Sequence, residues 1–186
     1  PVHTDGVGAA IEIIRASTET VTILAIAPMT NFPSILKRCP DCVSKVKVVA
    51  MFGSVYYGYG NWTVPSPEYN VHTCISCSQA FVTAGWPLTI TPLDTCGVAN
   101  LVGEAYHTFL NGSSVMSAVL AQSLLFWSTG TNRDLHAQSD TWYDAVAAYL
   151  ALPSHPAIEL TKMKISVNDK GMTVPDPTNG TSMEVA

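Results

Sequence analysis

Hydrophobic residues gather in three short runs in the first half of the chain, at residues 21–27, 45–51 and 87–93. These runs are rich in β-branched residues and are flanked by proline, glycine or polar positions, which is typical of buried strands in a parallel sheet. Segments with the apolar spacing of a helix lie before and between them, at residues 9–16, 29–38 and 75–84. This alternation predicts right-handed crossovers and a mainly parallel sheet.

The second half has a different pattern. Longer apolar segments at residues 98–110, 113–128 and 141–152 predict helices, and the alternating residues 160–168 with 172–174 predict a closing hairpin. We therefore expect an α/β fold of three layers in one domain, residues 1–174. The remaining residues, 175–186, are expected to be a disordered tail.

Composition excludes several classes of protein. With 186 residues, 47% of them hydrophobic and 12% charged, the chain can bury a substantial core and is not disordered as a whole. A net charge of -5 without a large basic cluster argues against nucleic acid as a partner. The sequence contains no run of eighteen or more apolar residues, so it predicts no membrane span. The start at Pro1, without methionine or a signal peptide, suggests a processed or incomplete chain.

Two weaker signals concern the compartment. Sequons for N-glycosylation occur at Asn61, Asn111 and Asn179, and five cysteines are many for a cytosolic domain of this size. We therefore expect a secreted glycoprotein.

Polar residues gather in the segment 51–70, which follows the second predicted strand. It contains three glycines and then Asn61, Glu68 and Asn70. Amide and carboxylate groups at the end of a strand can match the hydroxyls of a sugar. The alternative is a surface loop that uses glycine and asparagine for its turns.

Three motifs give the chain a resemblance to a known family. The loop resembles the G-N-x-T...E-[FYW]-N segment of the inosine-uridine preferring nucleoside hydrolases. Residues 25–31, AIAPMTN, are similar to the A-L-G-P-L-T-N signature of that family, and residues 141–153 are similar to its H-D-P-L-A-V-A-Y helix start. The motifs occur in the order of the family, and the resemblance covers nearly the whole chain.

The resemblance implies a nucleoside hydrolase-like fold that lacks its first strands, and calcium-dependent cleavage of ribonucleosides to ribose and base. Thr30 and Asp144 would be calcium ligands, and the substrate would be bound by Met51, Asn61, Glu68, Asn70 and Tyr143. Because Asn61 would then face the pocket, Asn111 and Asn179 are the expected glycosylation sites.

The sequence departs from the family pattern in three ways. The N-terminal aspartate motif D-x-D-x-x-x-D-D, which supplies most metal ligands and activates water, is absent, so hydrolysis by this chain alone is in doubt. Tyr143 stands where the family has histidine, and Asn61 and Glu68 are one residue further apart than usual. The partner would be a ribonucleoside, together with an N-terminal fragment or further copies of the chain. The alternative function is a secreted, non-catalytic structural or assembly protein.

Four cysteines form two C-x-x-C pairs, Cys39 with Cys42 and Cys74 with Cys77. The spacing allows either a zinc site of four thiolates or disulfide bonds. Disulfides are favoured because the sequons indicate an oxidising compartment and because the pairs lie in separate crossovers.

Overall fold

The structure is a computed structural model that describes residues 2–60, 62–131 and 138–186. These residues form two compact units, one made of Pro1–Gly97 with Tyr143–Ala186 and the other of Val98–Trp142. The larger unit is built from two separate segments of the chain. The prediction of one domain stays a prediction.

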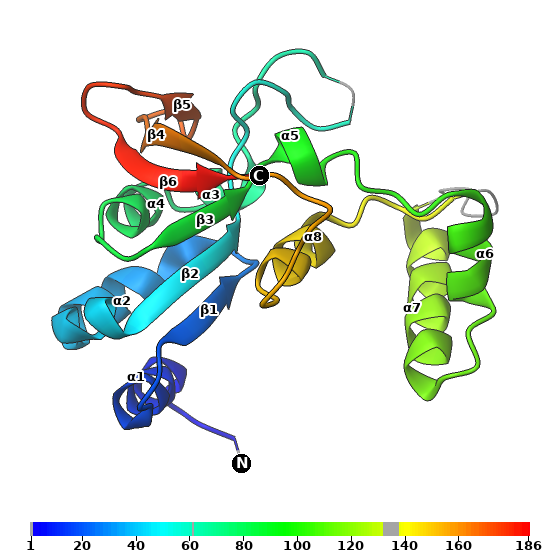
Figure 1. Cartoon of the computed structure of the whole chain (residues 1–186), viewed down its shortest axis with the longest axis horizontal. Coiled ribbons are helices and arrows are strands. Elements are labelled where there is room, and N and C mark those ends of the chain that lie inside the picture. The colour runs from blue at the N-terminus through cyan, green and yellow to red at the C-terminus, as the bar shows by residue number, and fades with distance from the viewer. Residues whose placement is uncertain (1, 61, 132–137) are drawn as a thin grey trace. The chain divides into compact units, whose positions relative to one another are not determined.

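The larger unit is organised around a six-stranded sheet with the order β1-β2-β3-β6-β4-β5 (Figure 1). Its strands are β1 (Val21–Ala25), β2 (Val46–Met51), β3 (Leu88–Thr91), β4 (Thr161–Val167), β5 (Thr173–Pro175) and β6 (Thr181–Val185). The pairs β1–β2, β2–β3 and β3–β6 are parallel, whereas β4 is antiparallel to both β5 and β6. The predicted parallel sheet with a hairpin is thereby confirmed.

Helices lie on both faces of this sheet. Its helical elements are α1 (Gly6–Ala16), η1 (Met29–Asn31), α2 (Phe32–Arg38), η2 (Pro40–Lys45), α3 (Tyr69–His72), α4 (Ile75–Val82), α5 (Leu93–Cys96) and α8 (Tyr143–Leu150). Residues of α1, α2 and α4 share one hydrophobic core with the sheet, and residues of α5 and α8 belong to a second core. In Figure 1, α2 and α8 flank β2 from opposite sides. The predicted three-layer α/β fold is present.

Strand β2 shows how the sequence builds these layers. Because side chains alternate along a strand, Val46, Val48 and Ala50 point into the first core, whereas Met51 points into the second. All four are buried, so β2 is covered on both faces. A continuous apolar run, rather than an alternating one, is the expected pattern for such a central strand.

The prediction of a disordered tail was wrong. Residues 181–185 form β6, which lies between β3 and β4 and buries Met183 and Val185. The local sequence does alternate, and Asn179-Gly180 before it is a turn signal, but the run is short and contains few strongly apolar residues. Its burial depends on two strands that are distant in the sequence.

The smaller unit consists mainly of two helices, α6 (Gly103–Leu110) and α7 (Val115–Thr131). Tyr106 of α6 is fully buried, while much of α7 carries exposed apolar side chains. No single described helix has the length and apolarity to cross a membrane, although α6 and residues 115–129 together pass that test as a pair bent by 109°.

Candidate functional site

The loop after β2 is shaped by the carboxylate of Glu68. Its Oε2 accepts hydrogen bonds from the backbone N–H groups of Gly53 (3.1 Å) and Val71 (3.3 Å), and its Oε1 accepts one from Asn70 (2.8 Å). Glu68 is therefore the N-cap of α3 and also closes the loop that begins at Gly53. This buried side chain gives the loop a defined shape, which a surface loop of glycine and asparagine alone would lack.

Two further side chains hold the start of this loop. Asp94 in α5 accepts three backbone N–H bonds, from Val55, Tyr56 and Tyr57, at 2.8, 2.7 and 3.2 Å. Thr173 in β5 accepts from the N–H of Ser54 at 2.8 Å and donates to its carbonyl at 2.7 Å. The loop is thus tied to elements that are 37 to 119 residues away in the sequence.

A pocket of about 440 Å³ opens beside this loop, at the carboxyl ends of β1 and β2. Such an end of a parallel sheet is where α/β folds bind ligands. The lining residues come from five stretches of the chain: Ile26, Ala27, Pro28, Met51, Tyr59, Glu68, Tyr69, Asn70, Tyr143 and Asp144. Five of the residues singled out in the sequence, those at positions 51, 68, 70, 143 and 144, are therefore brought together.

Asn70 has a fixed orientation in this pocket. Its Nδ2 donates to the backbone carbonyl of Met51 at 3.1 Å and lies 3.3 Å from the sulfur of the same residue. Because both contacts use Nδ2, Oδ1 is turned away from Met51. An amide oxygen held in this way can accept a hydrogen bond from a hydroxyl group of a ligand.

Two tyrosines form an aromatic wall. The rings of Tyr59 and Tyr143 meet edge to face with centroids 6.2 Å apart. The hydroxyl of Tyr59 also accepts a hydrogen bond from the N–H of Tyr69 at 2.8 Å, and burial raises the pKa of this phenol above its ordinary value. Tyr59 was not singled out in the sequence, where one aromatic residue among several in the loop carries no distinguishing signal.

The carboxyl groups of the pocket are partly removed from water. Burial raises the pKa of Glu68, the opposing effect of its three N–H donors being smaller, and the nearby Asp144 raises it further. Burial likewise raises the pKa of Asp144, the second residue of α8. Two carboxylates in one pocket create a negative potential that favours a ligand with positive charge.

The other predicted site residues lie apart or outside the described residues. Thr30 is exposed in η1, and Pro28 rather than Thr30 lines the described part of the pocket. Asn61 lies outside the described residues. The roles assigned to Met51, Asn61, Glu68, Asn70 and Tyr143 in substrate binding stay predictions.

The described residues do not fit a complete calcium site. Calcium in proteins takes about six to eight oxygen ligands, commonly including several carboxylates. Among residues 2–60, 62–131 and 138–186, no group of three or more His, Cys, Asp or Glu side chains is placed to hold a metal ion. Asp144 lines the pocket, but both oxygens of Glu68 already accept backbone N–H bonds.

The two C-x-x-C pairs are disulfides, Cys39–Cys42 and Cys74–Cys77, as favoured from the sequence over a zinc site. Cys96 is a buried free thiol whose Sγ donates to the Pro92 carbonyl at 3.2 Å, and burial raises its pKa to about 12. Asn111 and Asn179 are exposed, as an acceptor for glycosylation must be.

The sequence is similar to a family of nucleoside hydrolases and to curated members of that class. The family model described as inosine-uridine preferring nucleoside hydrolase matches residues 1–185. A pyrimidine-specific ribonucleoside hydrolase RihA of Citrobacter koseri is 29% identical over 114 residues, which are 61% of this chain and 36% of that protein. The RihA of Escherichia coli O139:H28 matches to the same extent. The chain thus spans little more than a third of the length of these curated relatives.

Solved structures show the same fold. A purine-preferring ribonucleoside hydrolase from Gardnerella vaginalis superposes with a TM-score of 0.78 at 20% identity, over 100% of this chain and 61% of that one. A plant nucleoside hydrolase superposes with a TM-score of 0.83 at 17% identity, over 100% of this chain and 63% of that one. At these identities the likeness establishes the fold and not the substrate.

Proposed function

Because the chain belongs to the inosine-uridine preferring nucleoside hydrolase family, we propose that its pocket binds a ribonucleoside and serves hydrolysis of the N-glycosidic bond. Water would add to the anomeric carbon of the ribose, the bond to the base would break, and the base would leave with a proton. This proposal rests on one observation, which is that Met51, Glu68, Asn70 and Asp144 line the same pocket. Its volume, about 440 Å³, lies within the range of small-molecule sites.

Each group of the pocket has a chemical task in this proposal. Oδ1 of Asn70 would accept a hydrogen bond from a ribose hydroxyl, and the wall of Tyr59 and Tyr143 would contact the flat face of the base. The sugar acquires positive charge as the bond to the base breaks. The carboxylates of Glu68 and Asp144 would stabilise that charge more than they stabilise the neutral substrate.

Calcium dependence is part of the proposal only through the family resemblance. By that resemblance, Asp144 and the backbone carbonyl of Thr30 would be two ligands, and among the described residues no group of three or more His, Cys, Asp or Glu side chains completes the site. Isothermal titration with calcium chloride checks this part. If Asp144 and the carbonyl of Thr30 are the only ligands, we expect no saturable binding at calcium concentrations below the millimolar range. Saturable binding in that range would show that further ligands complete the site.

The decisive assay is release of reducing sugar from inosine and uridine, with and without calcium. Substitution Asp144→Asn should lower the rate by roughly 100-fold or more, a typical loss for a group that stabilises charge in a transition state. Glu12→Gln, on the exposed surface of α1, is the matched control and should leave the rate unchanged. Equal rates for Asp144→Asn and the wild type would contradict the role of this pocket.

The alternative, a non-catalytic assembly protein that keeps the fold, is favoured by one observation. β1 lies at one end of the sheet, and Leu24 and Ile26 beside that edge are exposed. Edge strands can pair with another chain. Saturation-transfer NMR with inosine separates the two proposals. Binding of inosine to the pocket would support the enzyme, whereas the absence of both binding and reaction would support the assembly function.

Secretion and glycosylation remain proposals as well. They are supported by the two disulfides and by the exposure of Asn111 and Asn179. Expression through a eukaryotic secretory pathway, followed by enzymatic removal of N-glycans, tests them. A loss of mass that disappears in the variants Asn111→Gln and Asn179→Gln is the expected result.

A further inference from the structure

The two disulfides close loops of the same length but lie in different surroundings. The sulfur-bearing residues Cys39 and Cys42 are 0% and 2% exposed, whereas Cys74 and Cys77 are both partly exposed. Thiol–disulfide exchange requires a thiolate to reach one sulfur in line with the bond, so exposure governs which bond can be attacked. The chain thus offers one sheltered bond and one accessible bond with the same C-x-x-C spacing.

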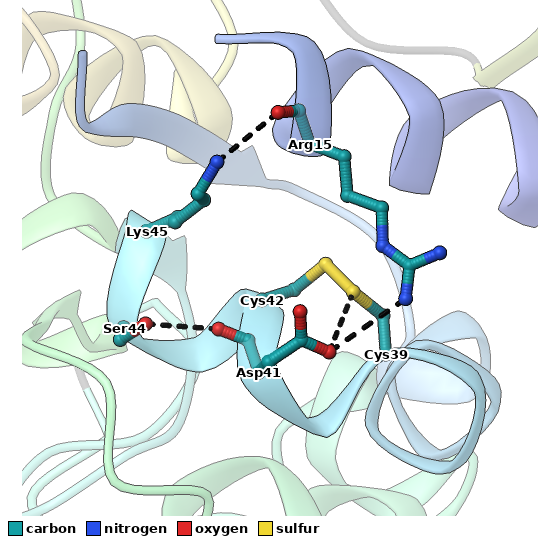
Figure 2. The surroundings of a disulfide bond; sticks show 6 residues. All are labelled: Arg15, Cys39, Asp41, Cys42, Ser44 and Lys45. Atoms are coloured by element: carbon teal, nitrogen blue, oxygen red, sulfur yellow. Dashed lines mark hydrogen bonds and ion pairs between the residues drawn. A yellow bond between two sulfur atoms is a disulfide. The ribbon is translucent and has the colours of Figure 1, made fainter. Parts of the chain in front are cut away.

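Figure 2 shows what shelters the first bond. Sγ of Cys39 lies 3.5 Å from Oδ1 of Asp41, and this carboxylate forms an ion pair with Arg15 of α1 at 3.6 Å. Lys45 donates to the backbone carbonyl of Arg15 at 3.1 Å, which ties η2 to the end of α1. The carboxylate of Asp41 beside Cys39 would repel an approaching thiolate, although its ion pair with Arg15 offsets part of this charge.

The second bond lies at the start of a helix. Cys74 is the N-cap of α4, and Cys77 lies in its first turn. Within the described chain, no side chain caps this helix end. The N–H groups of a first helical turn stabilise a nearby thiolate, which makes a cysteine there a better leaving group. Cys39 is likewise the N-cap of a helical element, η2, so accessibility is the difference that favours cleavage of Cys74–Cys77.

This bond also adjoins the pocket through α3. The last backbone bond of α3 runs from the N–H of Thr73 to the carbonyl of Tyr69 at 3.0 Å, and Cys74 follows directly. Asn70 lies within α3, and Glu68 caps it. The disulfide thus closes the first turn of α4 directly after α3, and α4 in turn contacts α2 and β4. Without it, the first turn of α4, which directly follows the short helix that carries Asn70, would lose its covalent bridge.

We propose that Cys74–Cys77 is a redox modification site, which a dithiol reduces selectively and whose reduction loosens α3 and the pocket. A thiolate of the dithiol attacks one sulfur, forming a mixed disulfide and releasing the other cysteine as a thiolate. The second thiolate of the reductant then displaces the first cysteine and closes its own disulfide. Two electrons pass from the reductant to the protein, and each cysteine ends as a thiol. The effect on nucleosides rests on the proposed function, whereas the reduction does not.

The test titrates the whole oxidised protein with dithiothreitol under native conditions, alkylates it with iodoacetamide and maps the labelled peptides by mass spectrometry. Cys74 and Cys77 should become labelled at reductant concentrations at least about ten-fold below those that label Cys39 and Cys42, because access limits exchange. Cys96 is an internal control that should stay unlabelled while the fold is intact. Labelling of both pairs together, or of Cys39 and Cys42 first, would overturn the proposal.

Hydrogen exchange separates the modification from the proposed function. Selective reduction should speed exchange of the amides of residues 69–74 several-fold while β2 and β3 stay protected. The double variant Cys74→Ser with Cys77→Ser should show the same exchange and no response to dithiothreitol. Unchanged exchange in this segment after reduction contradicts the link to the pocket. If exchange rises but no nucleoside binds before or after reduction, the proposed function fails and the modification site stands.

Discussion

The backbone N–H of Gly53 donates to Oε2 of Glu68 across 3.1 Å, joining the two ends of the loop that shapes the pocket. Gly53 has a φ of +88°, a conformation that residues with a Cβ rarely adopt. The same carboxylate caps α3, which carries Asn70. One buried side chain therefore links the start of the loop to the helix that carries the pocket amide.

Substitution of Gly53 by alanine should cost stability for two separate reasons. A Cβ there would lie 2.7 Å from the side chain of Thr173, in addition to the unfavourable φ. Gly85→Ala is the matched control, because Gly85 has a φ of +89° and no atom within 4 Å of the added Cβ. Gly85→Ala should cost about 1–2 kcal/mol and Gly53→Ala roughly 1–3 kcal/mol more, measured by urea unfolding. Equal losses would show that the contact with Thr173 relaxes freely.

Thr173 should matter through its hydroxyl and not through its size. Thr173→Val keeps the shape but leaves the buried N–H and carbonyl of Ser54 without this partner, at an expected cost of about 1–3 kcal/mol. Thr173→Ser keeps the hydroxyl and should retain more stability than Thr173→Val. Denaturant unfolding of both variants checks the order, and a valine variant as stable as the wild type would contradict it.

Stability should depend on pH through Glu68. Burial raises the pKa of this carboxyl above its ordinary value of 4.5, so between that value and the raised pKa the folded protein binds more protons than the unfolded chain. The free energy of unfolding therefore falls as the pH rises through this window and becomes constant above it. Asp144 contributes in the same direction from its ordinary value of 3.8.

Glu68→Gln isolates this effect. The amide cannot ionise, so the slope of stability against pH should be smaller than in the wild type. The variant should also be less stable by about 1–3 kcal/mol at every pH where the wild type is folded, because an NH₂ group replaces one oxygen that accepts backbone N–H bonds. Unfolding curves from pH 4 to 8, taken at intervals of roughly half a unit, measure both quantities. An unchanged slope would place the titration on another group.

Tyr59 should affect nucleoside binding through its hydroxyl. Tyr59→Phe removes the acceptor for the N–H of Tyr69 and should weaken inosine binding by roughly 2- to 10-fold, the worth of one hydrogen bond. Tyr57→Phe is the control, because Tyr57 is 55% exposed as a residue and does not line the described pocket. Dissociation constants from NMR titration give the comparison, and equal losses in both variants would contradict a specific role of Tyr59.

Much of the architecture follows from local patterns. The apolar runs predicted both ends of β1, β2 and β3 to within two residues, because a strand buried on both faces must be apolar throughout. The helices between them were equally visible in their spacing. By contrast, β6 was missed because its five residues are buried only through β3 and β4, which are brought beside it by the fold.

The candidate site divides in the same way. Sequence alone determined that Met51 and the loop with Glu68 and Asn70 follow a strand at the edge where a parallel sheet binds ligands, since chain direction sets which end each residue occupies. Asp144, at the start of a helix, was assigned to the site only through the family resemblance. Only the tertiary structure decided that Glu68 holds Gly53, that Asp94 anchors residues 55–57, and that Tyr59 meets Tyr143. These contacts join residues far apart in the sequence, and hydrogen bonds between them exist only once the sheet has brought their elements together.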